Sequence, residues 1–423
     1  MDTKVSILVR NGLLVTQDES RRVIEGNLYA EDGRILEVAG PERSADLVLD
    51  AEGCIVLPGL INCFTRASDI LLGPPRDTPV EVTLDRMETL RRRLTRRDVQ
   101  LAAALASAEM LLQGTTTFLD VCQWEEEVAR AITQVGGRGF LSWLVVDPED
   151  LNSCDKHLSH FRSWERIVPL IGPASMANVE LLEQVEALAK ERGTKWSLSL
   201  SESRGDVYRF QRKMGVRPVE WLEKMGLLSP NLIALQGVWL TMNEIRSLAR
   251  ADVKVVHCPV SNQMKGIGGP MALLEMLEEG VTVGLGTDSP AVCGTTDLFR
   301  HMRACALLHK GQKWDATAVP AQLLLDLCTV KAAEVLGLDG GSLRKGNIAD
   351  LTILSPRWRL PQDASEEALS HVVHLAEGMH VRDVIVGGKL VVENGILKTL
   401  DVEGLREDID TLRMELGHEE SGH

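Results

Sequence analysis

Two acidic residues and one histidine each follow a short apolar segment of the kind that forms a buried strand. Glu202 follows KWSLSLS, Asp288 follows VTVGLGT, and His257 follows VKVV. Two carboxylates at strand ends can act as a general acid/base pair, and a histidine can bind substrate or shuttle a proton. A structural alternative stays open for each: salt bridges with Arg66 or Arg204 for the two acids, and a hydrogen-bonded role at the strand end for His257.

Eight cysteines are scattered along the chain, and none forms a Cys-x-x-Cys pair. This distribution predicts reduced, buried thiols. Cys63 and Cys258 are also candidate nucleophiles that His257 or Arg66 would activate. A metal site that joins these two cysteines to His257 and Asp288 is a further alternative, but no short ligand spacing supports it.

Two weaker signals lie further along the chain. His301 and His309 are eight residues apart, roughly on one face of an expected helix, and we predict ordinary surface positions for them. Gly268-Gly269 in KGIGGPM precedes an expected helix. It is a weak phosphate-binding signal because no Lys-Ser/Thr pair follows.

The elements that position these residues alternate between short apolar strands and longer helical patterns. GTTTFLDVC, RGFLSWLVVD and LIALQGVWL are typical of strands, and VELLEQVEALAKERG of a helix. Repeated strand–helix alternation predicts an α/β protein whose parallel sheet closes into a (β/α)8 TIM barrel over residues 57–345. Both chain ends have β-hairpin character and predict one small β-sandwich domain from residues 1–56 and 346–400. Residues 401–423 are expected to form a surface helix and a tail.

Composition and charge exclude several classes of protein. The chain has 423 residues, 44% hydrophobic and 25% charged, which is ordinary for a globular protein. A formal net charge of −15 makes nucleic acid an unfavourable partner. We see no signal peptide and no membrane-spanning stretch, so we expect a cytoplasmic protein with no membrane partner.

Seven segments occur in a recognisable order along nearly the whole chain. They are LPGLIN (57–62), GTTTFLD (114–120), LSES (200–203), GVWLT (237–241), HCPVSN (257–262), LGTDSP (285–290) and GSLRKGNIADLTIL (341–354). This order resembles the amidohydrolase superfamily, in its branch of deaminases and chlorohydrolases that act on guanine, S-adenosylhomocysteine and triazines. The resemblance implies the barrel, the small β domain and hydrolysis of carbon–nitrogen or similar bonds. Dimers are common among similar proteins, so we also expect a homodimer.

The resemblance implies a metal site that this sequence does not reproduce. Similar proteins hold a divalent metal with two histidines after strand 1, histidines after strands 5 and 6, and an aspartate after strand 8. The corresponding residues here are Phe64, Arg66, Ser199, Gln236 and Asp288. A phenyl ring donates no lone pair, and a guanidinium is permanently cationic. We therefore expect no metal and no cofactor at this site.

Three residues retain the places of the family's functional groups. Glu202 occupies the place of the general acid/base, Asp288 that of the last ligand and base, and His257 keeps its place in HCPVSN. We predict these three as catalytic residues. Arg66 is expected to point toward Asp288 and to supply, by pairing with it or with Glu202, the positive charge that the metal provided.

We predict a small-molecule ligand in the barrel mouth. It is expected to contact Arg66 and the remaining positions of the missing metal site, which are Phe64, Ser199 and Gln236. Three functions stay open: hydrolysis of a C–N bond without metal, binding of a ligand or partner without catalysis, and an isomerase or lyase reaction. An open, polar barrel mouth favours catalysis or ligand binding. A mouth filled by Phe64 favours a non-catalytic protein.

Overall fold

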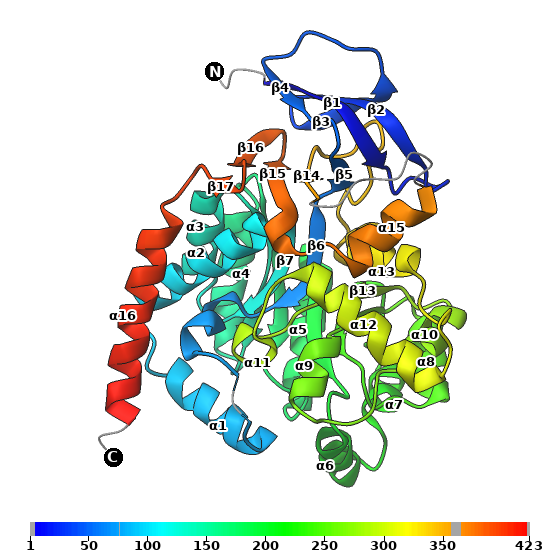
Figure 1. The fold of residues 1–423 in the computed structure, drawn as a ribbon. Coiled ribbons are helices and arrows are strands. Elements are labelled where there is room, and N and C mark those ends of the chain that lie inside the picture. The colour runs from blue at the N-terminus through cyan, green and yellow to red at the C-terminus, as the bar shows by residue number, and fades with distance from the viewer. Residues whose placement is uncertain (1–4, 76, 357–364, 421–423) are drawn as a thin grey trace.

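Eight parallel strands close into a barrel at the centre of the molecule (Figure 1). The computed structural model describes residues 5–75, 77–356 and 365–420. A bridge between Thr65 and Asp288 joins the first barrel strand to the last, so the predicted barrel is confirmed. Its strands are β6 (Leu60–Thr65), β7 (Thr115–Cys122), β8 (Arg138–Val145), β9 (Ile167–Pro173), β10 (Trp196–Leu200), β11 (Leu232–Gln236), β12 (Lys254–His257) and β13 (Val283–Leu285).

Helices follow the barrel strands and cover the outside of the sheet (Figure 1). Ser203 and Thr241 begin two of them with capping boxes, in which each hydroxyl accepts from the backbone N–H three residues on. These helical elements are η1 (Ala67–Leu72), α1 (Val80–Arg91), α2 (Arg96–Leu112), α3 (Glu125–Val135), α4 (Asp150–Phe161), α5 (Val179–Arg192), α6 (Arg204–Met214), α7 (Pro218–Lys224), α8 (Met242–Arg250), α9 (Pro259–Met264), α10 (Leu273–Glu278), α11 (Pro290–Cys293), α12 (Leu298–Lys313), α13 (Ala321–Leu327) and α14 (Val330–Leu336).

Side chains of each barrel strand alternate between the barrel interior and the helical layer. Phe64 and Val256 belong to the interior cluster, whereas Val255 packs in the layer between strands and helices. His257 follows Val256 and therefore faces the helices, because successive side chains point to opposite faces of a strand. Cys258 packs in the interior cluster again.

Strands from both chain ends form the small domain, as the sequence predicts, but they are connected in one mixed sheet of nine strands. The sheet lies beside one end of the barrel (Figure 1). Its strands are β1 (Ser6–Val15), β2 (Val23–Glu31), β3 (Arg34–Gly40), β4 (Leu47–Asp50), β5 (Ile55–Pro58), β14 (Leu351–Leu354), β15 (Val381–Val386), β16 (Lys389–Glu393) and β17 (Ile396–Leu397).

Within the residues that the structure describes, three further helical elements follow the barrel in the chain. They are α15 (Ser365–His374), η2 (Gly378–His380) and α16 (Val402–Glu420), and α16 packs along α2 at the edge of the barrel (Figure 1). No helix among the described residues is both long and apolar enough to cross a membrane. Residues 1–4 and 357–364 of the predicted small domain, and residues 421–423 of the predicted tail, lie outside the described residues.

Candidate active site at the barrel mouth

A buried lysine links the two predicted catalytic acids. Lys265 Nζ lies 2.5 Å from Glu202 Oε1 and 2.7 Å from Asp288 Oδ2. The lysine side chain is 5% exposed and Asp288 7%, whereas Glu202 is 27% exposed. The ammonium group is thus enclosed between a buried carboxylate and one that reaches the surface of the mouth.

Asp288 is held as an anion by three donors to the same oxygen. Its Oδ2 accepts from Ser261 Oγ at 2.6 Å, from Gln236 Nε2 at 3.1 Å and from Lys265. Burial alone would raise the pKa of Asp288, but Lys265, the nearby Arg66 and the hydrogen bonds hold it well below its ordinary value. The two carboxylates in turn raise the pKa of Lys265 despite its burial. The ammonium group of Lys265 therefore lies between the carboxyl groups of Glu202 and Asp288.

Backbone strain marks the strand ends that carry these groups. Ser201, Gln236 and Asp288 have φ values of 50°, 78° and 61°. Residues other than glycine rarely adopt this left-handed region, and such strain concentrates at functional sites. Ser201 lies between β10 and Glu202, so the strained turn aims the glutamate at the mouth.

Arg66 lies beside this cluster but does not form the expected ion pair. Its guanidinium donates to the Val121 carbonyl at 3.4 Å and lies 5.8 Å from the centroid of the Phe64 ring. In the described part of the chain, the ion pairs of Glu202 and Asp288 are with Lys265. Arg66 acts on Asp288 at longer range, by lowering its pKa. Lys265 thus has the pairing role that the sequence assigned to Arg66.

A cavity of about 400 Å³ opens next to Glu202. Its polar lining includes Arg66, Ser199, Ser201, Glu202, Arg209 and Lys213. A second cavity of about 340 Å³ shares Arg66 and Ala174 with it and extends to Arg91. Phe64 is buried in the barrel interior and does not line either cavity. Beside Glu202, the mouth is therefore an open, polar recess of the size that binds a small molecule.

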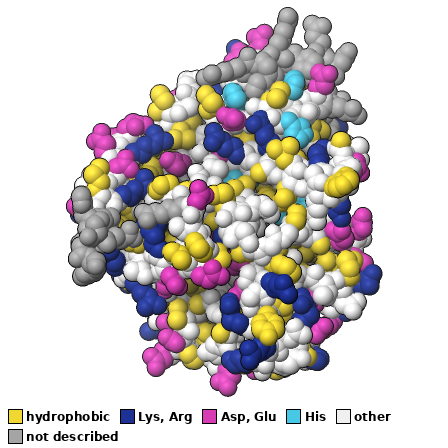
Figure 2. Space-filling view, turned by 60° about the horizontal axis from the view of Figure 1, so that its bottom comes forward, with side chains coloured by type: hydrophobic (Ala, Val, Ile, Leu, Met, Phe, Trp, Pro, Cys, Tyr) yellow, Lys and Arg dark blue, Asp and Glu magenta, His cyan; other side chains and the backbone are white. Residues whose placement is uncertain are grey.

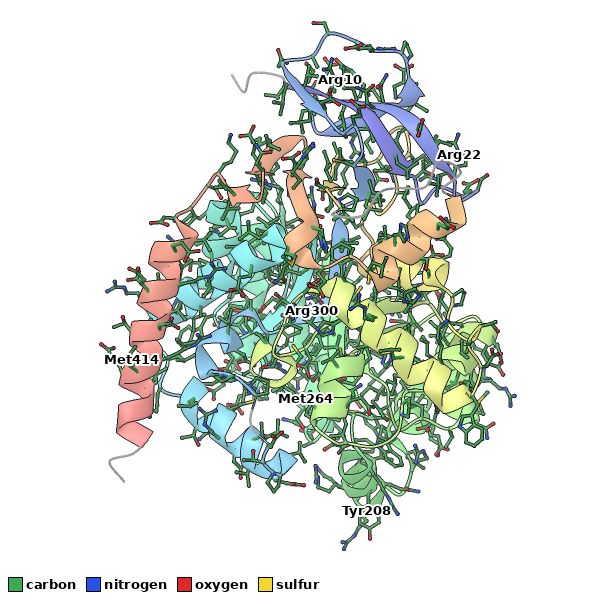
Figure 3. All side chains as sticks on the ribbon, in the orientation of Figure 1. Arg10, Arg22, Tyr208, Met264, Arg300 and Met414 are labelled. Atoms are coloured by element: carbon green, nitrogen blue, oxygen red, sulfur yellow. The ribbon has the colours of Figure 1, made fainter. Side chains whose placement is uncertain are left out.

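Mixed charges surround this end of the barrel. Figure 2 turns the bottom of Figure 1 forward and shows basic and acidic side chains interspersed among scattered hydrophobic ones. Figure 3 shows Tyr208 on the outer side of α6 and Met264 on α9, next in the chain to Lys265. Both labelled side chains are exposed, whereas the side chain of Lys265, directly after Met264, is buried in the mouth.

Several predicted residues lie away from the mouth. His257 faces the helices and shares a hydrogen bond of 3.1 Å with His309. His301 and His309 are both buried, so the predicted surface positions are wrong: α12 packs their side chains inward. Cys258 points to the opposite side of its strand from His257, so the alternative metal site does not assemble.

The cysteines have the environment that the sequence predicts. All eight are free and buried. Burial raises the pKa of the Cys63 and Cys258 thiols, which opposes the thiolate needed by a nucleophile. These observations favour small apolar packing residues over covalent catalysts.

Two functional candidates escape the sequence reasoning. Lys265 is the first residue of KGIGGPM, a segment in which the sequence offers only a weak phosphate-binding signal. HCPVSN, which begins eight residues earlier at a strand end, places this segment at the mouth. Asp120, the last residue of GTTTFLD, is buried, and its carboxylate accepts from Ala67 N at 2.6 Å. Burial raises the pKa of Asp120 to about 6, which the charge of Arg66 partly offsets.

The chain is a (β/α)8 barrel whose residues Glu202 and Asp288 follow the C-terminal ends of strands, the end at which barrel enzymes carry their active sites. Residues 55–391 match the Amidohydrolase family, and the chain belongs to that family. Its deaminase relatives act on C–N bonds.

The chain is 34% identical to a 5-methylthioadenosine/S-adenosylhomocysteine deaminase of Pyrococcus furiosus, over 94% of this chain and 97% of the relative. It is 33% identical to a 5'-deoxyadenosine deaminase of Methanothermobacter thermautotrophicus, over 97% and 99% of the two chains. An adenosine deaminase structure from Xanthomonas campestris with bound zinc superposes with a TM-score of 0.92 at 25% identity, over 97% and 98% of the chains.

Proposed function

We propose that this protein hydrolyses the C–N bond of a small amino-substituted compound in the barrel mouth without a metal ion. The observation that carries the proposal is the ammonium group of Lys265 between Glu202 and Asp288. It supplies a positive charge at the point where the two carboxylates converge. The open cavity beside Glu202 provides room for a ligand.

The donor set of the mouth does not fit the family's metal. Of the five positions that the resemblance assigns to ligands, only Asp288 offers a carboxylate, and its Oδ2 already accepts three hydrogen bonds. Zinc is usually held by at least three nitrogen, sulfur or carboxylate ligands. An ammonium group within 2.7 Å of Asp288 also repels a second cation. We therefore derive no step through a metal.

Glu202 is the proton carrier in this proposal. Its carboxylate lines the cavity and is partly exposed, so it is within reach of water and ligand. Glu202 accepts a proton as water adds to the carbon that bears the amino group, and it returns a proton to the departing nitrogen. Water is consumed, the C–N bond breaks, and the products are a carbonyl compound and ammonia.

The two cations of the mouth have separate tasks. Lys265 orients Glu202 through the short contact to Oε1 and keeps Asp288 ionised. Arg66 lies between the two cavities and is available to stabilise negative charge that develops on the ligand during addition. Ser199 lines the same cavity as a hydrogen-bonding group.

The relatives suggest the substrate class with which to begin. Deaminases of 5-methylthioadenosine, S-adenosylhomocysteine and 5'-deoxyadenosine cover almost the whole chain. We propose aminopurine nucleosides as the first compounds to test, with release of ammonia as the readout.

The test measures ammonia release by the full-length protein after dialysis against a chelator. We expect activity to persist in the wild type, to fall by about 10²–10⁴-fold in Glu202→Gln, and to be lost in Lys265→Met. Lys254→Met is the matched control because Lys254 is also a buried lysine paired with two acids, outside the mouth. Activity that needs added metal, or that survives Glu202→Gln unchanged, contradicts the proposal.

Ligand binding without turnover is the second candidate function. The observation in its favour is that Lys265 neutralises both acids and holds the pKa of Asp288 low, which makes Asp288 a weak base. Calorimetric binding of the same nucleosides with no ammonia released would select this candidate. Solvent isotope exchange into a bound ligand, with no ammonia, would select an isomerase or lyase reaction.

A further inference from the structure

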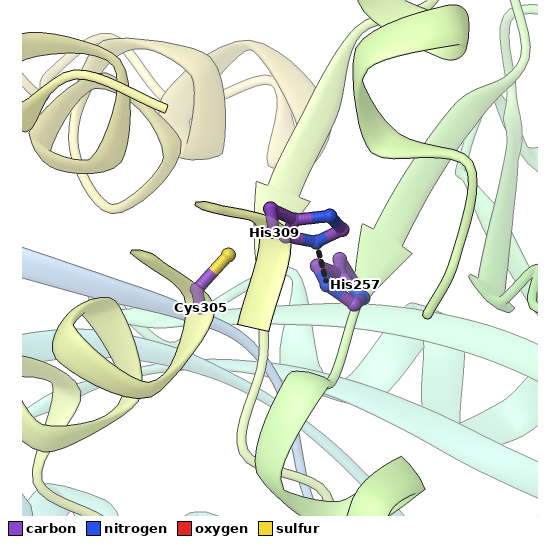
Figure 4. A group of neighbouring side chains, drawn as sticks. All are labelled: His257, Cys305 and His309. Atoms are coloured by element: carbon purple, nitrogen blue, oxygen red, sulfur yellow. Dashed lines mark hydrogen bonds between the residues drawn. The ribbon is translucent and has the colours of Figure 1, made fainter. Parts of the chain in front are cut away.

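A buried cluster of two histidines and one cysteine lies between the barrel and its helical layer. His257 ends β12, and Cys305 and His309 are one helical turn apart on α12 (Figure 4). One ligand atom from each of these three side chains lies within 4.8 Å of the other two. Cys305 is fully buried and each histidine is 1% exposed.

The polar groups of this cluster are poorly satisfied by the protein. The two histidines share one hydrogen bond, Nε2 to Nε2 at 3.1 Å. His257 Nδ1 has no hydrogen-bond partner among the described residues. The His257 ring therefore makes one hydrogen bond in a buried position, through the nitrogen that faces His309. A bound cation would join the two facing nitrogens, each of which can offer a lone pair as neutral imidazole.

The spacing fits a metal ion after a small rearrangement. Metal–nitrogen and metal–sulfur bonds of about 2.0 and 2.3 Å place ligand nitrogens about 3.3 Å apart and nitrogen and sulfur about 3.6 Å apart. The histidine nitrogens already stand at 3.1 Å. The remaining separations do not exceed 4.8 Å, so a shift of about 1 Å brings the sulfur to bonding distance.

A second side chain contacts His309 from outside the cluster. Gln312, one helical turn further along α12, shares a side-chain hydrogen bond with this histidine. Outer partners of this kind orient metal-binding histidines. Cys305 and His309 lie four residues apart and so present their side chains on one face of α12.

We propose that His257, Cys305 and His309 form a binding site for a transition-metal ion that accepts nitrogen and thiolate ligands. Copper(I) and zinc(II) share this preference. Copper(I) with one thiolate and two neutral imidazoles is uncharged, which suits a buried site, whereas zinc(II) carries one excess positive charge there. The site is separate from the barrel mouth because His257 faces the helices and Asp288 lies in the mouth. The proposal is independent of the proposed catalytic function.

The experiment uses the full-length protein, stripped of metal by a chelator under reducing, anaerobic conditions. One sample is titrated with copper(I) against a chromophoric chelator. A second is titrated with cobalt(II), the spectroscopic substitute for zinc(II). We expect one equivalent of one of these ions per chain, with a thiolate-to-cobalt absorption band if the divalent ion binds.

Three variants locate the ion. Cys305→Ala is expected to weaken binding at least about 100-fold and to abolish the thiolate band, and Gln312→Ala to weaken it about 10-fold. Cys154→Ala is the matched control, because Cys154 is also a buried cysteine on a helix, outside the cluster. It should bind like the wild type, and circular dichroism checks that all variants fold.

Failure of the wild type to bind either ion would overturn the site, as would binding that persists in Cys305→Ala. If Asp288→Asn, and not Cys305→Ala, removes the ion, the metal lies in the barrel mouth. That result would overturn the metal-independent mechanism as well. If Cys305→Ala removes the ion and activity is unchanged, the site stands apart from catalysis.

Discussion

Two buried lysines join acidic residues at opposite ends of the barrel. Lys254 begins β12, contacts Asp252 at 2.6 Å and Glu334 at 3.2 Å, and is 7% exposed. Lys265 follows α9, contacts its two acids at 2.5 and 2.7 Å, and is 5% exposed. The two lysines are therefore alike in burial and in the number of their acidic partners.

The partners differ, and that difference separates a structural ion pair from a candidate catalytic one. Asp252 is 58% exposed and Glu334 45%, so water solvates the carboxylates around Lys254. Asp288 is almost fully buried, and Glu202 opens on a cavity of about 400 Å³. A buried lysine paired with acids is thus a functional signal only where the partner is also buried and a ligand can reach the cluster.

The comparison is tested most strongly by removing each ammonium group. Lys265→Met should lower the free energy of unfolding by about 3–5 kcal/mol, because it leaves the Asp288 charge buried without its cation. Lys254→Met should cost only about 1 kcal/mol, because its exposed partners regain water. Urea denaturation at pH 7 measures both values.

A second substitution checks the cause of the larger loss. Adding Asp288→Asn to Lys265→Met should recover part of the lost stability, since the unpaired charge is gone. Equal losses for the two single lysine variants would contradict the distinction between the two ends of the barrel.

Asp120 provides a pH-dependent test at the mouth. Its folded-state pKa of about 6 lies above the unfolded value, so its contribution to stability is present at low pH and is lost as the pH rises through about 6. This shift of about 2 units corresponds to about 3 kcal/mol between pH 4 and pH 7. Asp120→Asn should remove that part of the pH dependence in urea denaturation.

The pH dependence of the stability contribution has the opposite sign for Asp288. Because folding lowers the pKa of Asp288, this residue contributes stability at pH values above its unfolded-state pKa. The contribution is lost as the pH falls through its folded-state pKa.

The test of Asp120 has a clear contrary outcome. A wild-type profile of stability against pH that matches the Asp120→Asn profile between pH 4 and pH 7 would show that burial does not raise the pKa of Asp120.

The fold could be predicted from the sequence because its signals are local and repeated. Strand segments such as GTTTFLDVC are buried throughout and alternate with helical periodicity, and the motif order defines the barrel. The acids of the mouth were found for the same reason, since Glu202 and Asp288 directly follow strands. The prediction that strands from both chain ends build the small domain is confirmed, although these strands connect in one sheet.

Lys265 could not be found by the same reasoning. Its side chain reaches the acids only because the short helix α9 carries the chain from β12 back over the mouth, and no periodicity records that path. From the sequence, the positive charge near Asp288 is assigned to Arg66, a cation next to a strand end, whereas the ion pair is with Lys265. The outward direction of His257 follows from strand alternation, which places it opposite to Val256.

Arg66 has a smaller expected effect than Lys265, because it acts on Asp288 at longer range. Arg66→Met should weaken binding of an aminopurine nucleoside about tenfold, or about 1.4 kcal/mol. Arg209→Met is the control from the same cavity, because Arg209 is exposed and paired with Asp206 at 2.5 Å. Isothermal titration calorimetry compares the two, and equal affinities would show that Arg66 does not contact the ligand.

The smallest effect is expected at the helix cap next to Glu202. Ser203 caps α6 through the backbone N–H of Asp206, and Thr95 caps α2 through that of Asp98. Ser203→Ala and Thr95→Ala should each cost about 1 kcal/mol of stability, because each loses one capping hydrogen bond. Only Ser203→Ala should also lower the rate of ammonia release, because the cap fixes the turn that aims Glu202 into the cavity. Equal rates in the two variants would mean that Lys265 alone is sufficient to orient the carboxylate.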